Sequence, residues 1–147
     1  IFDETMLALR QCAALELSRE PICCAVSVHH RLAAKDRLAV EDLYGERLML
    51  IKRGWSRSVD RLREDLWKNH PQIQIVDFDF YNTEAFNQCE NNNCVLMAMD
   101  YWRYVHPLMK ILPVEWDYTI PFGLFHAPAP SPGVERFLKA VEKVVRS

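Results

Sequence analysis

Residues 21–28 read Pro-Ile-Cys-Cys-Ala-Val-Ser-Val, a nearly continuous apolar run. A strand covered on one face alternates apolar and polar residues, whereas a run without alternation is typical of a strand covered on both faces. We therefore predict a central strand here, with the side chains of Cys23 and Cys24 on opposite faces. The chain has five cysteines, an odd number that disfavours a disulfide framework.

Strand and helix patterns alternate downstream of this run. A pattern of this kind is typical of an α/β domain with a mainly parallel sheet. The predicted elements are a strand at 47–51, a helix at 56–70, a strand at 73–80 with a bulge near Val76, a helix from 82 or 83 to 91, a strand at 94–99 and a short helix from 100 to 106 capped by Asp100.

The last third of the chain adds extended structure and one further helix. Residues 114–126 are extended and interrupted by Pro121, so part of this segment is expected to be an edge strand, a crossover or a loop rather than a central strand. Ser131 and Pro132 have the residue types of an N-cap and a first helical position. We predict a helix from there, with an apolar face formed by Val134, Phe137, Leu138, Val141 and Val144.

Composition limits the functions open to the chain. Its 147 residues suit one domain, and 18 Lys+Arg against 20 Asp+Glu give a net charge of −2. This balance provides no basic face for nucleic acid, so we expect the chain itself to bind no DNA. Its apolar runs fall short of the ~20 residues of a membrane span, and we expect a soluble protein without a membrane partner.

The loops that leave the predicted strands and open helices carry the candidate binding residues. In a parallel sheet such loops meet at one edge, where helix N-termini favour an anion. Arg53 can bind a carboxylate in a bidentate way, and Gly54 allows close backbone approach. The candidates are Lys52, Arg53, Gly54, Ser56, Asn82, Thr83 and Asp100. Helix capping is the alternative role for Ser56, Asn82, Thr83 and Asp100.

Other chemistry finds little support in the sequence. His29 and His30 follow Cys23 and Cys24, yet the chain has no Cys-x-x-Cys or His-Glu-x-x-His spacing. We therefore expect structural cysteines, no metal, no cofactor and no catalytic residue. The tryptophans at 55, 67, 102 and 116 are interpreted as core or cleft-lining residues.

The order of these pieces resembles the effector-binding domain of LysR-type transcriptional regulators. The matching pieces are residues 30–33, which are similar to the family's His-Pro-Leu-Ala turn, residues 38–43, residues 47–51 with Gly54, residues 84–99 and residues 131–144. Arg31 stands where the family has Pro, and three asparagines at 91–93 replace its glycines.

The resemblance implies a periplasmic-binding-protein-like (type 2) fold with two lobes. Residues 21–117 would form a nearly complete second lobe, and residues 1–20 and 118–147 would form crossover strands and the returning part of a partial first lobe. No segment resembles the winged helix-turn-helix or the first βα units of the first lobe. We therefore expect an uncovered apolar face on the last helix, which favours association with another segment or copy.

The resemblance also implies a function. A small, anionic effector would bind between the lobes and control DNA binding by a helix-turn-helix head outside this chain, in a cytoplasmic homodimer or higher homo-oligomer. The solute-binding protein of a transporter, which has the same fold, is the alternative. A small enzyme using His29, His30 or a cysteine is a further alternative, which the missing motifs disfavour.

Overall fold

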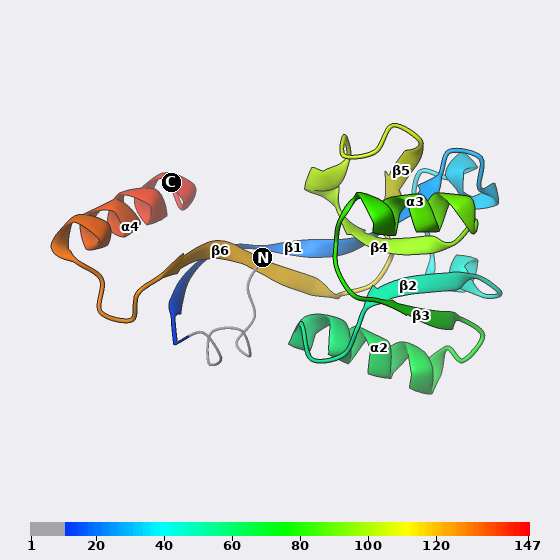
Figure 1. Cartoon of the computed structure of the whole chain (residues 1–147), viewed down its shortest axis with the longest axis horizontal. Coiled ribbons are helices and arrows are strands. Elements are labelled where there is room, and N and C mark those ends of the chain that lie inside the picture. The colour runs from blue at the N-terminus through cyan, green and yellow to red at the C-terminus, as the bar shows by residue number, and fades with distance from the viewer. Residues whose placement is uncertain (1–10) are drawn as a thin grey trace.

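The computed structural model describes residues 11–147, and its sheet is built on one long strand, β1 (Ala13–Ser27). The second half of β1 pairs antiparallel with β4 (Val95–Met99) and β5 (Met109–Leu112), and the first half pairs with β6 (Thr119–His126). Figure 1 shows β1 and β6 extending together from the main body toward α4 (Pro132–Val145). The predicted central strand is confirmed, although it begins well before Pro21.

The sheet is mixed rather than mainly parallel. The strand order is β3-β2-β4-β1-β5, with β6 paired to β1. β2 (Arg47–Ile51) is parallel to β4 and to β3 (Gln74–Phe78), as the alternating pattern predicts. β1 is antiparallel to its neighbours because it enters the body from the side toward which β2, β3 and β4 run (Figure 1).

Helices cover both faces of this sheet. α2 (Arg57–Asn69) packs on one face and α3 (Thr83–Asn91) on the other. Cys24 belongs to the core on the α2 side and Cys23 to the core on the α3 side, which confirms their opposite orientation. The α2 side chains in the core are Val59, Leu62 and Leu66, and those of α3 are Ala85, Phe86 and Cys89.

The bulge expected near Val76 is wrong. The register between β2 and β3 is unbroken from Arg47 opposite Gln74 to Ile51 opposite Phe78. Because both faces of the sheet are covered, Ile75 can pack on the α2 side and Val76 on the α3 side without any irregularity. In a strand that is covered on both faces, apolar residues can therefore occupy consecutive positions without a bulge.

Short turns connect the remaining elements. Two 3-10 helices, η1 (Arg31–Ala34) and η2 (Val40–Leu43), follow β1, and Gly45 ends the second with φ of 80°. Asn93 has φ of 53° in the turn before β4, as expected for an asparagine in a glycine position. Strand β5 was not predicted.

Helix α4 begins as the sequence predicts. Ser131 Oγ accepts a hydrogen bond from Val134 N at 3.4 Å, and Pro132 is the first helical residue. Phe137 is 60% exposed and Val144 is 74% exposed, so much of the apolar face is uncovered within the described residues.

The lobe boundaries at 21–117 stay a prediction, and the part of the expected first lobe at 1–10 lies outside the described residues. No described helix combines the length and the hydropathy that crossing a membrane requires.

Candidate functional site

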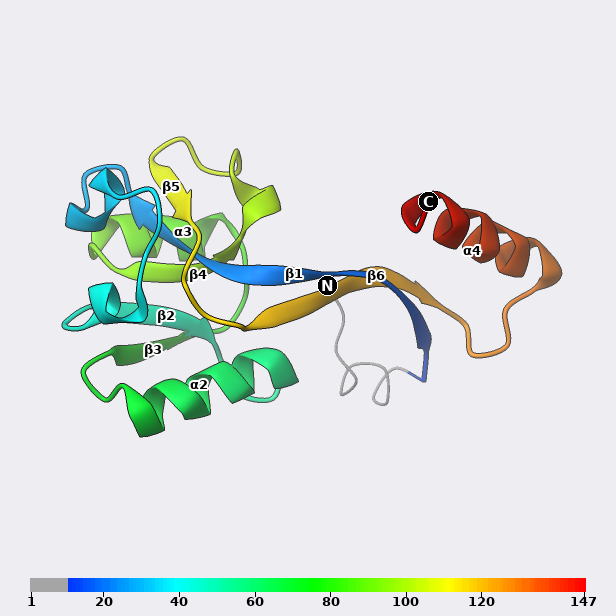
Figure 2. The same ribbon diagram turned by 180° about the vertical axis from the view of Figure 1, so that it is seen from behind.

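The candidate site is the edge of the sheet where β2, β3 and β4 end. These strands run toward the side of the body from which β1 and β6 extend, and the N-termini of α2 and α3 lie on the same side (Figures 1 and 2). The loop after β2 spans residues 52–56, the loop after β3 spans residues 79–82, and η3 (Asp100–Trp102) follows β4. The topology therefore brings together the three loops that the sequence singled out.

Two hydrogen bonds join the loop at 52–56 to the start of helix α2. Ser56 Oγ caps the helix by accepting a hydrogen bond from Val59 N at 3.3 Å. Gly54 N donates to Asp60 Oδ2 at 3.2 Å, and Gly54 itself has φ of 92°. The helix thus fixes the backbone shape of the loop through its own first two turns.

The two cations of this loop are loosely paired with surface carboxylates. Lys52 Nζ lies 3.5 Å from Asp79 Oδ1, and Arg53 Nη1 lies 3.8 Å from Glu64 Oε1. The side chains of Arg53, Glu64 and Asp79 are largely exposed, and that of Lys52 is 43% exposed. Exposed pairs of this kind contribute ~0–1 kcal/mol, so an anion can replace the carboxylate at little cost.

Asn82 caps helix α3. Its Oδ1 accepts a hydrogen bond from Ala85 N at 3.0 Å, and Thr83 is the first helical residue. Both side chains are exposed. The alternative role of a helix cap is therefore confirmed for Asn82, and it leaves the amide nitrogen of that side chain available to a ligand.

Asp100 is not the helix cap that the sequence predicts. Met99 occupies the N-cap position of η3, and no side chain bonds there. Asp100 instead forms an ion pair with Arg103, which raises the pKa of that guanidinium through the hydrogen bond and the nearby charge. Because η3 is a single 3-10 turn, the third loop provides no helix N-terminus to an anion.

The seven candidate residues do not line one hollow. Arg53 lines a hollow of about 380 Å³ along α2, together with Glu64, Asp65, Trp67 and Lys68. Asn82 and Thr83 line another, of about 330 Å³, together with Tyr81, Phe86, Trp102 and Val105. Lys52, Gly54, Ser56 and Asp100 line neither of them.

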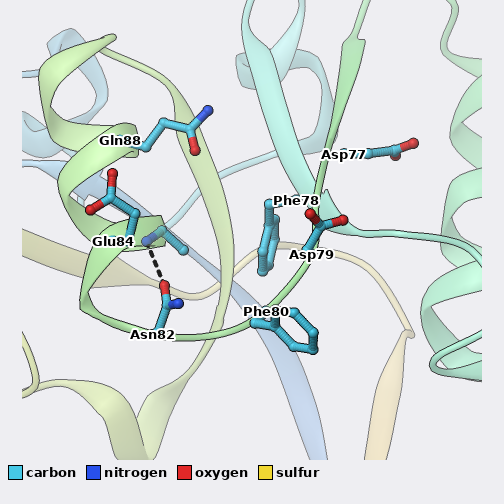
Figure 3. A pocket seen from close by; sticks show the side chains of 8 residues that line it. Asp77, Phe78, Asp79, Phe80, Asn82, Glu84 and Gln88 are labelled. Carbon is cyan, nitrogen blue, oxygen red and sulfur yellow. Dashed lines mark hydrogen bonds between the residues drawn. The ribbon is translucent and has the colours of Figure 1, made fainter.

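A third hollow, of about 300 Å³, lies between the end of β3 and helix α3 (Figure 3). Asp79 and Glu84 face it together with Phe80, Asn82 and Gln88, as the close-up shows. Two carboxylates give this hollow a negative character. It is therefore an unfavourable place for the anion itself.

Aromatic side chains from different loops contact one another at this edge. The rings of Trp55 and Phe80 have centroids 5.7 Å apart, and Lys52 Nζ lies 5.8 Å from each of these centroids. Tyr81 and Trp102, from the loops after β3 and β4, have centroids 4.6 Å apart. Trp102 and Trp116 pack against the core, which confirms the sequence interpretation for these two, whereas Trp67 is 77% exposed.

Sequence reasoning missed one residue that supports this edge. Arg63 in α2 is 6% exposed, donates from Nη2 to Ile51 O at 2.7 Å, and forms an ion pair with Asp77 on β3. It therefore ties α2 to the last residue of β2, directly before the candidate loop. An arginine inside an otherwise apolar helix face was the available signal.

The cysteines have the character of structural thiols. All five are free, and Cys24 and Cys89 are fully buried. Burial raises the pKa of Cys24 far above the ordinary thiol value and raises the pKa of Cys89 to about 12. Within residues 11–147, no group of three or more His, Cys, Asp or Glu side chains could hold a metal ion.

Residues 6–146 match the family described as LysR substrate binding domain. The match covers nearly the whole sequence, and the chain belongs to this family. It is a substrate-binding domain of the kind found in LysR-type transcriptional regulators. No curated protein matches the chain.

Solved structures of regulatory domains share the fold. The regulatory domain of CcmR from Synechocystis PCC6803, in complex with 2-PG, is 12% identical with a TM-score of 0.67, over 92% of this chain and 68% of that one. The effector-binding domain of QuiR, in complex with shikimate, is 14% identical with a TM-score of 0.70, over 93% and 66%. The reduced OxyR regulatory domain from Pseudomonas aeruginosa is 14% identical with a TM-score of 0.64, over 92% and 66%.

At such identities the likeness shows the fold alone, and it confirms the periplasmic-binding-protein-like α/β fold. The chain spans about two thirds of the length of these related chains.

Proposed function

We propose that this chain is the effector-binding part of a LysR-type transcriptional regulator and binds a small organic anion at the edge formed by the loops after β2 and β3. The observation that carries the proposal is the LysR family match over residues 6–146. The related domains of CcmR and QuiR are complexes with 2-PG and shikimate, respectively. The family match favours regulation over the solute-binding protein of a transporter.

The ion pairs at this edge would allow a ligand carboxylate to replace a protein carboxylate next to Lys52 or Arg53. Lys52 and Arg53 are the cations of the loop, and each pairs with an exposed carboxylate at 3.5 Å or more. A ligand carboxylate that takes the place of Asp79 releases that side chain, which is 73% exposed, into water. Asn82 adds a neutral donor at the N-terminus of α3, where the helix dipole also favours negative charge.

Regulation requires that the effector binds one arrangement of the assembled regulator better than another. A ligand with equal affinity for both arrangements shifts no equilibrium. In the proposal, the effector stabilises one arrangement of cytoplasmic homo-oligomers. This changes DNA binding by a helix-turn-helix domain elsewhere in the regulator, while the present chain contacts no DNA.

The test is a thermal-shift screen of small organic acids with the purified chain. We expect at least one acid to raise Tm, because a ligand that binds only the native state stabilises it. The shift should be lost in Lys52→Gln and reduced in Arg53→Ala. Arg37→Ala is the matched control, since Arg37 is an exposed arginine whose pair with Glu115 involves neither loop. The proposal fails if no acid gives a shift that depends on Lys52 or Arg53.

A further inference from the structure

The edge of the sheet exposes aromatic side chains beside its cations. Phe80 is 57% exposed, Tyr101 is 44% exposed and Phe122 is 40% exposed. Single exposed apolar residues are ordinary, but a group of them around polar residues marks a binding surface. We infer that the effector carries an aromatic ring next to its acid group. This inference rests on the proposed function and adds the class of ligand.

The position of Lys52 is the first argument. Its Nζ lies 5.8 Å from the centroids of both Trp55 and Phe80, which pack edge to face at 71°. An acid group that binds Lys52 therefore has two aromatic rings within reach of the rest of its molecule. Phe80 follows the end of β3 and is 57% exposed within residues 11–147, so its ring is open to such a ligand (Figure 3).

The aromatic surface continues beyond this pair. Tyr101, in the turn after β4, packs against Phe122 of β6 with ring centroids 5.6 Å apart. Tyr101 also contacts Trp102, whose ring meets that of Tyr81. The aromatic side chains at this edge therefore come from the loops after three strands and from β6 itself. Aromatic faces and edges attract another aromatic ring in stacked or edge-to-face geometry.

A carboxylate nearby restricts where the acid group can lie. Glu84 lines the hollow between β3 and α3, on which Phe80 also borders, and it remains there when the ligand displaces Asp79 from Lys52. An anion is repelled there, whereas the uncharged ring of the same ligand is not. The ligand that fits both features has its ring on Phe80 and its acid group turned toward Lys52.

The experiment is saturation-transfer NMR on the purified chain with benzoate and acetate as the two probes. Benzoate has the ring and acetate has only the acid group. We expect benzoate to bind about tenfold more tightly than acetate. Phe80→Ala should remove most of this preference, and Lys52→Gln should weaken both acids. Tm of each variant checks that the fold is retained.

Two matched controls come from helix α4. Phe137→Ala removes a phenyl ring of similar exposure, 60% against 57% for Phe80, and should leave benzoate binding unchanged. Lys139→Gln removes an exposed lysine paired with Glu135 and should change neither acid.

Different outcomes separate the inference from the proposed function. Equal affinities of benzoate and acetate, both dependent on Lys52, would overturn the aromatic ligand and leave an anion site in place. Equal loss of benzoate binding in Phe80→Ala and Phe137→Ala would also overturn it. Binding of neither probe, when a non-aromatic acid gives a Lys52-dependent thermal shift, would do the same. Absence of any Lys52-dependent or Arg53-dependent ligand removes the proposed function itself.

Discussion

The ion pair between Arg63 and Asp77 connects helix α2 to strand β3. Substitutions at these two residues test how much this contact stabilises the edge of the sheet. Arg63 is 6% exposed, whereas the side chain of Asp77 is 58% exposed. The two single substitutions therefore have different physical consequences. Asp77→Asn leaves a buried guanidinium without its carboxylate, while Arg63→Met leaves a carboxylate that water already reaches.

The magnitudes follow from this asymmetry. Removing one partner of a fully buried pair costs about 3–5 kcal/mol, and because Asp77 is half in water we expect about 2–3 kcal/mol for Asp77→Asn. Arg63→Met loses the hydrogen bond to Ile51 O but keeps an apolar stem, at a cost of about 2 kcal/mol. Once the guanidinium is gone, Asp77→Asn adds almost nothing, so the double variant should also lose about 2 kcal/mol.

Urea unfolding of the chain and the three variants measures these free energies. The expected coupling between the two residues is about 2–3 kcal/mol. Single losses that add up in the double variant would refute the reasoning, because they would mean that the two side chains stabilise the fold independently.

Three further predictions concern backbone strain and buried thiols. Gly54→Ala should cost about 1 kcal/mol in urea unfolding, since its φ is 92° and an added Cβ meets no atom within 4 Å, whereas Gly133→Ala, in α4, should be neutral or stabilising. Alkylation at pH 8 should modify Cys12 well before Cys24 or Cys89, and equal rates would contradict their burial. The free energy of unfolding should fall as pH rises above 9, because burial raises the pKa of Cys89 from 9.0 to about 12 and the unfolded chain therefore loses the thiol proton first. Cys89→Ala should reduce the slope of the free energy of unfolding against pH, and an unchanged slope would exclude the thiol as its cause.

Local patterns predicted most elements of the fold. The helix at 57–69 followed from apolar residues at helical spacing, and Ser56, Asn82 and Ser131 are caps as their positions indicate. The same local reasoning was wrong for Asp100, because its segment continues for only one 3-10 turn and its carboxylate finds Arg103 instead.

The candidate site was predicted only in part. The sequence identified the three loops, since parallel strands end at one edge, and the structure places those loops there. It could not separate Arg53, which lies along α2, from Asn82 and Thr83, which border α3. The direction of an exposed side chain depends on neighbours that are distant in sequence, and no periodicity encodes them.

Local sequence patterns predicted most of the strands and helices, although not β5, and they predicted that both faces of the sheet are covered, because these features depend on apolar spacing and caps within a few residues. Three other features follow from the assembled fold: β1 runs antiparallel to its neighbours, Arg63 pairs with Asp77, and Lys52 lies over Phe80. Each of these contacts joins different elements of the chain. Such contacts form only when the sheet has assembled, and the proposed ligand site depends on them.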